Sequence, residues 1–427
     1  MANGFQKITM NTKSDAVLNL ESVASFLGIS TATVRNWVKC GYLETLGEKT
    51  KYFFHKKEVE NIKENIANGN FEKLNKRANK SKADRTFIPE EYLKDPQRID
   101  SLNKIIHFIK ENDIDISTSL FLVCLNSLKK ERILSDISIE DVIREEKFIF
   151  RNKQIEEEIK SWYSEIKKES IKPAFSFLLN CSLPDQRDIL GFIYQSLLQE
   201  GKKSQIGSYY TPSVIVDEII SEYTKKDSKV LDPCCGTGQF LMAFSDIIEN
   251  PANIYGVDFD EIAVRIARLN ILAKYKDISF TPNIVCKNTL FDIGVYDLFN
   301  LKDENIRDFD VIATNPPWGV HFPKENIEKL KNLYSEITSL ESFSYFLKKS
   351  IDLLRDGGII SFILPESILN VKTHSDIRKI ILENSHIKKI SYLDRVFKNV
   401  FTPVIRLDLK KGRDENPGGE HAFLGII

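Results

Sequence analysis

Residues 309–318 read FDVIATNPPW. The first six residues form a short, mostly apolar and β-prone run, which is typical of a buried parallel strand. The tetrapeptide Asn315-Pro316-Pro317-Trp318 follows at the carboxyl end of that strand. Because open α/β sheets bind ligands at the carboxyl edge of their strands, this stretch predicts an α/β fold with a ligand site directly after residue 314.

The tetrapeptide carries groups suited to methylating a flat amine. The Asn315 side-chain oxygen and the Pro316 carbonyl can each accept one hydrogen from an exocyclic amino group, and Pro316 and Pro317 stiffen the backbone. Trp318 offers a face on which a base can stack. Two acceptors that hydrogen-bond to the N–H groups keep the nitrogen lone pair from delocalising into the ring. The lone pair can then attack a methyl group. The alternative is a simple turn, for which Asn-Pro-Pro is also typical.

A cofactor loop is predicted upstream. Residues 229–240 read KVLDPCCGTGQF, a pattern of strand, glycine turn and helix start in which Gly236 and Gly238 permit close approach of a ligand. A second predicted strand, residues 253–258, ends in Asp258, 20 residues beyond Gly238, where an acid can bind ribose hydroxyls. Phe240 and Leu241 stand where a dinucleotide fingerprint has its third glycine, which disfavours NAD or FAD and suits S-adenosylmethionine.

A third segment, residues 207–212, reads GSYYTP and precedes an apolar-periodic run over residues 214–223. The pattern predicts a helix with Thr211 as its N-cap and Pro212 as its first residue. Such a cap leaves the adjoining tyrosines, Tyr209 and Tyr210, without an explanation.

In this order, the segments resemble the amino-group DNA methyltransferases, specifically N6-adenine enzymes such as the modification subunits of type I restriction systems and the methyltransferase halves of type IIG enzymes. The resemblance covers about residues 200–410. It implies S-adenosylmethionine as cofactor, with Asp258 on the ribose and Asn288 on the cofactor adenine, where many family members have Asp. It places the following residues along the methionine part of the cofactor: Tyr210, Thr211, Asp232, Gly236 and Gly238.

The same resemblance implies that the target adenine is flipped out of the duplex. It assigns catalysis to Asn315, Pro316, Pro317 and Trp318, with no metal. Trp318 would stack on the base from one face and Phe401 from the other, with Phe397 as a competing candidate. Downstream, the pattern predicts a helix through residues 344–354 and strands at residues 359–364, 387–393 and 404–409.

Composition agrees with a cored enzyme. The chain has 427 residues, 42% hydrophobic content and a formal net charge of −1, which allows two or three domains. No apolar run approaches the roughly 20 residues of a membrane span, and the first residues lack the apolar core of a signal peptide, so we expect a cytoplasmic protein without membrane contact. Six cysteines without a Cys-x-x-Cys pair support neither a zinc site nor a disulfide framework.

Positive charge gathers in residues 1–90, which hold 15 Lys and Arg against 10 Asp and Glu. Predicted helices at residues 20–27 and 31–39, with a turn between them and a possible wing at residues 49–54, resemble the winged helix of MerR-like and excisionase-like proteins. Val34 and Trp37 are expected in its core. The residues expected to contact DNA are Thr31, Thr33, Arg35, Asn36, Lys39, Lys49 and Lys51. A module for protein contact is the alternative.

These patterns predict four parts: a winged helix-turn-helix over residues 1–70, a basic linker over 71–94, a helical domain over 95–200 and a Rossmann-like methyltransferase domain over 201–427. A helical domain in that place resembles type I modification subunits, in which it packs on the catalytic core and faces partner subunits. Glu158-Ile159-Lys160 has the Glu-x-Lys form of a nuclease motif, but a predicted helix without a preceding Asp argues against cleavage.

The sequence therefore predicts an adenine-N6 DNA methyltransferase, acting as the modification component of a restriction-modification system. Two alternatives stay open: a methyltransferase for N4 of cytosine or another amino group, and a non-catalytic regulator that binds DNA and responds to S-adenosylmethionine. The target sequence cannot be read. Because only residues 412–427 follow the last predicted strand, we expect recognition from a specificity subunit, or else the chain is shorter than the natural protein.

Overall fold

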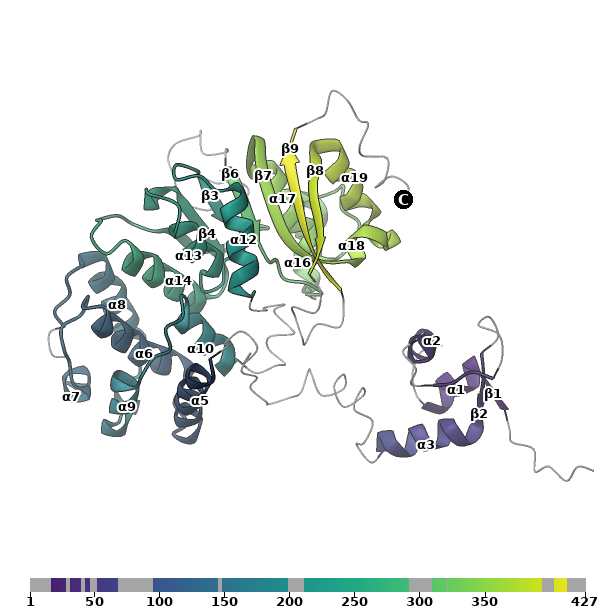
Figure 1. The fold of residues 1–427 in the computed structure, drawn as a ribbon, viewed down its shortest axis with the longest axis horizontal. Helices are drawn as coiled ribbons and strands as arrows, with labels where there is room; N and C mark the ends of the chain where they lie inside the picture. The colour runs from purple at the N-terminus through teal and green to yellow at the C-terminus, as the bar shows by residue number, and fades with distance from the viewer. Residues whose placement is uncertain are drawn as a thin grey trace, which may run out of the picture. The chain divides into compact units, whose positions relative to one another are not determined.

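The computed structural model describes residues 17–27, 31–39, 43–46, 52–67, 95–144, 148–198, 211–291, 309–320, 322–393 and 403–412. The chain divides into two compact units, Met1–Ala83 and Asp84–Ile427. Figure 1 shows both units, with the described segments drawn as helices and strands. The predicted linker at residues 71–94 falls outside the described residues. No described helix is long and apolar enough to cross a bilayer.

The described residues of the first unit form three helices and a two-stranded sheet. Helices α1 (Leu20–Leu27) and α2 (Thr31–Lys39) have the predicted bounds, and α3 (Lys56–Ala67) follows them. Strand β2 (Phe53–His55) pairs antiparallel with β1 (Val17–Asn19), a strand that the sequence pattern did not indicate. The expected core residues are confirmed, since Val34 and Trp37 are buried, together with Val23, Ala24, Leu43, Phe54, Val59 and Ile62.

The second unit is built on a seven-stranded mixed sheet with the order β5-β4-β3-β6-β7-β9-β8. The five strands from β5 to β7 are parallel, and β9 runs antiparallel to both of its neighbours. The predicted Rossmann-like mixed sheet is therefore confirmed. Its strands are β3 (Val230–Asp232), β4 (Ile254–Asp258), β5 (Asn283–Cys286), β6 (Phe309–Thr314), β7 (Leu354–Pro365), β8 (Ser385–Tyr392) and β9 (Val404–Lys411).

Two hydrophobic cores cover the two faces of this sheet, because successive strand residues point to opposite sides. Leu231 and Ile312 pack toward one face, whereas their neighbours Val230 and Val311 pack toward the other. Helices α16 (Lys324–Leu333), α17 (Ser342–Leu353), α18 (Ser367–Asn370) and α19 (Ser375–Asn384) belong to the first face. Helices α12 (Ser213–Tyr223), α13 (Gln239–Ser245) and α14 (Glu261–Lys274) cover the second (Figure 1).

The region before the sheet is helical, as its pattern predicts. It contains α5 (Pro96–Glu111), α6 (Ile116–Lys130), α7 (Ile139–Ile143), α8 (Lys153–Glu165), α9 (Ser176–Asn180) and α10 (Ile189–Leu197). These helices share one hydrophobic core with α14 through Ala263, Ile266, Leu269 and Leu272. Figure 1 shows them beside α14, at the end of the sheet remote from β8. The helical region and the sheet therefore form a single compact unit.

Helix α12 is fixed to the sheet by buried charges on β9. Arg406 and Asp408 are 1% and 0% exposed, and they form an ion pair of 2.7 Å. Arg406 Nη2 also contacts Glu222 on α12 at 2.7 Å, and the Tyr223 hydroxyl donates to Asp408 at 2.8 Å. Because breaking a buried charge pair is costly, this network holds α12, and with it the segment that enters α12, in one position.

Candidate functional site

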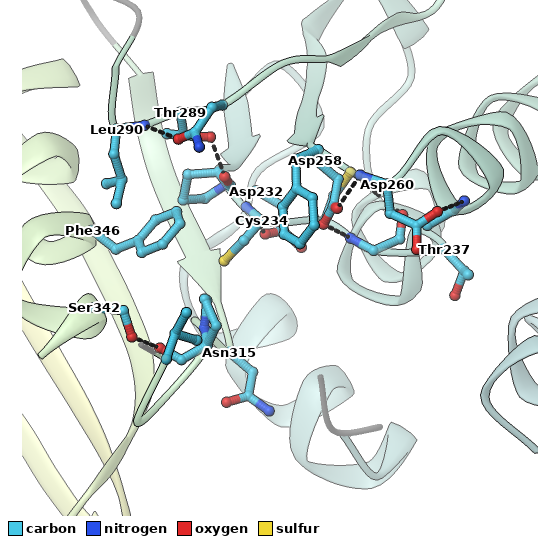
Figure 2. Close-up of a pocket in the computed structure, with 18 of the residues that line it drawn as sticks. Asp232, Cys234, Thr237, Asp258, Asp260, Thr289, Leu290, Asn315, Ser342 and Phe346 are labelled. Atoms are coloured by element: carbon cyan, nitrogen blue, oxygen red, sulfur yellow. Dashed lines mark hydrogen bonds between the residues drawn. The ribbon is translucent and has the colours of Figure 1, made fainter. Parts of the chain in front are cut away.

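One cavity lies at the carboxyl ends of the parallel strands, where open α/β sheets bind ligands. Its walls come from α10, from the loops after β3, β4, β5 and β6, and from the start of α17. Figure 2 shows Asp232, Asp258 and Asn315 around this one pocket, although they follow or end three different strands. The structure thus brings together residues that the sequence placed after separate strands, including Gly236 and Asn288, and Thr211, which it placed at the start of a helix.

Asp232 ends β3 and is a buried acid at the floor of the cavity, with 1% of its surface exposed. Its Oδ1 accepts hydrogen bonds from the Thr314 hydroxyl at 2.6 Å and from the Cys234 amide at 3.1 Å. Burial raises the pKa of Asp232 to about 7, although both hydrogen bonds act to lower it. A cationic ligand would stabilise the ionised form of this carboxylate.

Asp258 ends β4, and both of its carboxylate oxygens contact the neighbouring loops. Oδ2 accepts from the Gly236 amide at 2.8 Å, and Oδ1 accepts from the Asp260 amide at 3.0 Å. Burial raises the pKa of Asp258 to about 6. Each oxygen keeps a further lone pair, so Asp258 can still accept hydrogen bonds from ligand hydroxyls.

The glycine loop after β3 adopts a conformation that glycine permits. Gly236 and Gly238 have φ angles of 51° and 94°, and Gly238 stands at the N-cap position of α13. The loop is held to the segment before α12 by Gln239, whose Oε1 accepts from the Thr211 amide at 3.2 Å and whose Nε2 donates to the Thr211 carbonyl. Residues 211 and 239 are therefore locked together across the cavity wall.

Thr211 also connects this wall to Asn315. Asn315 Nδ2 donates to Thr211 Oγ1 at 3.1 Å, which fixes the orientation of the amide. Asn315 Oδ1 is buried and accepts no hydrogen bond within the described part of the chain. A buried acceptor without a donor is costly and therefore uncommon. Asn315 is also one of the residues that line the cavity.

The predicted helix cap at Thr211 is wrong. Helix α12 begins at Ser213 with Pro212 in the N-cap position, and no side chain caps it. The physical reason is that the Thr211 hydroxyl accepts from Asn315, which lies far away in the sequence, and so does not bond to the first turn of the helix.

The remaining residues of the tetrapeptide turn in different directions. The Pro317 carbonyl accepts from the Ser342 hydroxyl at the start of α17. Trp318 does not line the cavity; its indole nitrogen donates to the Ile363 carbonyl on β7 at 3.3 Å, and its ring packs against both cores. Stacking of Trp318 on a base stays a prediction.

The other predicted site residues fall in the cavity wall, elsewhere among the described residues, or outside them. Gly238 and Pro316 are described but do not line the cavity. Asn288 lines the cavity, and its Oδ1 accepts from the Leu290 amide at 3.1 Å. Tyr210, Phe397, Phe401, Lys49 and Lys51 lie outside the described residues, as do the side chains of Asn36 and Lys39. Arg35 is exposed on α2, and Thr31 and Thr33 are half-buried.

Several cavity residues were missed in the sequence. Tyr194, Gln195 and Leu198 reach the cavity from α10, a helix that was assigned to a separate domain. Phe259 and Phe346 add two aromatic side chains, and Phe259 is 59% exposed. An aromatic residue directly after the acid that ends β4 is a signal that could have identified Phe259. The α10 residues carry no comparable local signal.

Glu158, which belongs to the nuclease-like triplet, has a structural explanation. It lies on α8 and forms an ion pair with Arg268 on α14. Lys160 pairs with Glu156 on the same helix, at the surface. The triplet therefore contributes to the contact between α8 and α14 and offers no metal-binding strand.

Comparison with known proteins identifies relatives of this chain. A sequence profile of the family described as N-6 DNA Methylase matches residues 185–424. The chain is 26% identical over 412 residues to the Type II methyltransferase M.VspI of Vibrio sp. (strain 343), covering 96% of this chain and 76% of that protein. It is 28% identical over 243 residues to the methylase subunit of the type I restriction enzyme EcoEI of Escherichia coli, covering 53% of this chain and 46% of the subunit.

Solved structures share the fold. A modification subunit of a putative type I restriction enzyme from Vibrio vulnificus YJ016 superposes with a TM-score of 0.51 at 15% identity, covering 73% of this chain and 81% of the other. The Type IIL restriction-modification enzyme MmeI, solved in complex with DNA, gives a TM-score of 0.52 at 14% identity, covering 78% of this chain and 58% of MmeI.

Proposed function

Since the chain belongs to the N-6 DNA Methylase family, it transfers a methyl group from S-adenosylmethionine to adenine N6 in DNA, and we propose that Asn315-Pro316-Pro317-Trp318 carries out this transfer. The assignment rests on the environment of the Asn315 amide. Its nitrogen is held by Thr211, and its oxygen is buried without a donor among the described residues, in a residue that lines the cavity. That oxygen is a preorganised acceptor for an amino hydrogen.

These residues catalyse the transfer by positioning the target amino group. When bound, the cofactor would supply an electrophilic methyl group, whose bond to sulfur breaks as the bond to N6 forms, and one N6 proton would be released to solvent. Asn315 Oδ1 and the Pro316 carbonyl accept the two hydrogens of N6, which directs the nitrogen lone pair toward that methyl group. The amide cannot turn freely because Thr211 fixes its other end. A base inside a duplex cannot reach these acceptors, so the adenine must be flipped out, with Trp318 and Phe401 as the proposed stacking residues.

The residues around the cavity fit the proposed cofactor. Asp232 and Asp258 are acids with raised pKa values, which suits a ligand that carries positive charge and ribose hydroxyls. Phe259 and Phe346 offer apolar faces for its adenine ring, near Asn288. In this assignment Tyr210, Thr211, Asp232, Gly236 and Gly238 receive the methionine part, and Asp258 holds the ribose.

Cofactor binding should depend on pH. The positive charge of S-adenosylmethionine favours ionised carboxylates, and the pKa values of Asp232 and Asp258 are about 7 and about 6. Both groups are therefore ionised at about pH 8 and mostly protonated at about pH 5.5, so affinity should fall as the pH is lowered through this range. Titration calorimetry across it measures the effect, and Asp232→Asn should remove the upper part of the pH dependence. A constant affinity in the wild type would refute the assignment of both acids.

We further propose that the chain is the modification component of a restriction-modification system and that a specificity partner supplies the target sequence. One relative is a type II methyltransferase, and another is the methylase subunit of a type I restriction enzyme. Methylation-sensitive sequencing of DNA from cells that express the chain alone, or with its genomic neighbours, tests this proposal. Full, site-specific modification by the chain alone would contradict the need for a partner.

The N-terminal unit is proposed to be a winged helix-turn-helix that binds the DNA backbone. The support is the α1–α2 helix pair with its own small core, the exposed Arg35 and the positive balance of residues 1–90. Contacts to phosphates give affinity rather than sequence choice.

Deleting residues 1–83 should therefore lower DNA affinity and weaken its dependence on salt, without changing which sequence is modified. Mobility-shift assays at two salt concentrations and methylation mapping provide the two measurements. Arg35→Glu is the matched point variant and should also lower DNA affinity. A changed target sequence after the deletion would instead assign sequence reading to this unit.

The proposed transfer can be tested by following a labelled methyl group. The purified chain, assayed together with its genomic neighbours, and labelled S-adenosylmethionine should label duplex DNA, and should not label RNA or protein. Labelling of RNA or protein would favour the other amino-group methyltransferases. Cofactor binding without transfer to any acceptor would favour a regulator.

A further inference from the structure

Helix α10 touches both loops that form the proposed cofactor site. We infer that α10 acts as a clamp on these loops, so that Asp188, Gly191 and Tyr194 are positioning residues for cofactor binding. The inference rests on the assignment of this cavity to S-adenosylmethionine, and it extends that assignment to the helical region. The clamp consists of two separate links, one to the loop after β3 and one to the loop after β4.

The first link is made by Asp188, the N-cap residue of α10. Asp188 is 1% exposed, and its Oδ2 accepts from the Thr237 hydroxyl, in the glycine loop, at 2.6 Å. Its Oδ1 accepts from Asn270 on α14 at 2.8 Å and from the Gly191 amide at 3.0 Å. Asn270 also donates to the Thr237 carbonyl at 3.2 Å. One buried carboxylate thus joins α10, α14 and the residue between the two loop glycines.

This link requires very close approach of helix and loop. A Cβ atom placed on Gly191 would lie 2.1 Å from Asp188 Oδ2 and 2.1 Å from Thr237 Oγ1. Both distances are far below van der Waals contact, so no larger residue fits while Asp188 and Thr237 stay bonded. The contact with the glycine loop therefore explains why position 191 has no side chain.

The second link runs through Tyr194, one turn further along α10. Its hydroxyl donates to Asp260 Oδ2 at 2.5 Å, while Oδ1 of Asp260 caps α14 by accepting from the Ile262 and Ala263 amides. The Asp260 amide in turn donates to Asp258, the proposed ribose ligand, at 3.0 Å. Tyr194 itself lines the cavity, as do Gln195 and Leu198 on the same helix.

The coupling must be reciprocal. If α10 holds the loops in the geometry that binds the cofactor, then a bound cofactor stabilises the contacts of α10 by the same free energy. Hydrogen exchange should therefore slow in α10 when S-adenosylmethionine is added to the full chain. Helix α19, whose residues do not line the cavity, should show no such change and serves as the internal reference.

Cofactor affinity, measured by titration calorimetry on the full chain, tests the clamp. Asp188→Ala and Thr237→Val should each weaken binding by about tenfold, the usual loss for a hydrogen bond to a charged group. The double variant should bind about as weakly as the weaker single variant, because both changes remove the same hydrogen bond between Thr237 and Asp188. Gly191→Ala should weaken binding by a similar factor, and Tyr194→Phe by less.

Glu165→Gln provides the matched control. Glu165 on α8 accepts two hydrogen bonds from Arg265 on α14, at 2.7 and 2.9 Å, so it bridges the helical region and the sheet region, but neither residue lines the cavity. This variant should lower the melting temperature without changing cofactor affinity. If Asp188→Ala fails to fold, Thr237→Val decides, since it removes one hydroxyl from the loop and leaves α10 intact.

Two outcomes would overturn the inference: unchanged affinity in Thr237→Val and Gly191→Ala, or equal changes in exchange in α10 and α19 when the cofactor is added. If the wild-type chain itself does not bind S-adenosylmethionine, the cofactor assignment fails, and the inference fails with it. The two kinds of failure are therefore distinguishable.

Discussion

Asn315→Ala is expected to reduce methyl transfer by about three orders of magnitude while leaving affinity for S-adenosylmethionine within about twofold. The substitution removes the buried acceptor Oδ1 and the amide nitrogen that bonds to Thr211. The acceptor is needed only when the target amine is in place, whereas the proposed cofactor contacts lie on other loops. Single-turnover transfer and calorimetry separate the two quantities.

Asn326→Ala is the matched control for this prediction. Asn326 is also an asparagine in the cavity wall, but it lies on α16, and the proposed reaction makes no use of it. Its loss should change transfer far less than the loss of Asn315. Normal transfer by Asn315→Ala, or an equal defect in both variants, would remove Asn315 from the catalytic assignment.

Asp258→Ala is expected to weaken binding of S-adenosylmethionine by about 1.5–3 kcal/mol, the usual contribution of a hydrogen bond to a charged group. The carboxylate is proposed to hold the ribose hydroxyls, and it also accepts from the Gly236 and Asp260 amides. Its removal therefore eliminates the contact with the ribose and the two hydrogen bonds that hold the loops after β3 and β4. Calorimetry at about pH 8, where the carboxylate is ionised, measures the loss directly.

Asp277→Ala is the control for Asp258→Ala, because Asp277 is exposed and does not line the cavity. It should leave cofactor affinity unchanged. Affinity that is also unchanged in Asp258→Ala would refute the ribose assignment, even if transfer were reduced.

The parts of the fold that the sequence predicted are those set by local pattern. Residues 309–314, a short apolar run, form β6 with the predicted bounds, and the glycine loop, Asp258 and Asn315 meet at one sheet edge. Parallel strands end at the same edge of a sheet, so residues that follow them are brought together whatever their separation in the chain. That rule needs no knowledge of side-chain contacts.

The parts that were missed depend on contacts between distant residues. The short polar pattern around Thr211 is typical of a helix cap, yet its hydroxyl bonds to Asn315. Asp188 does cap its own helix, but nothing near it in sequence indicates that it also holds Thr237. Assigning residues 95–200 to a separate domain hid the contribution of α10 to the cavity. Periodicity reveals which face of α10 is apolar, but not which loop lies against it.

Trp318 illustrates a different limit. A sequence motif assigns it to the target base, whereas in the structure it donates to the Ile363 carbonyl and packs on the sheet. Both are possible for one side chain if the motif describes the ring with a base present. The indole N–H lies in the plane of the ring, so this hydrogen bond does not by itself prevent stacking on a ring face.

Methylation of adenine N6 in DNA by this site can be tested by identifying the methylated nucleoside. Duplex DNA incubated with the chain and S-adenosylmethionine, together with its genomic neighbours where these are required, is digested to nucleosides and analysed by mass spectrometry. We expect N6-methyldeoxyadenosine, which should be lost with Asn315→Ala. N4-methyldeoxycytidine as the modified nucleoside, or N6-methyldeoxyadenosine formed equally well by the variant, would contradict it.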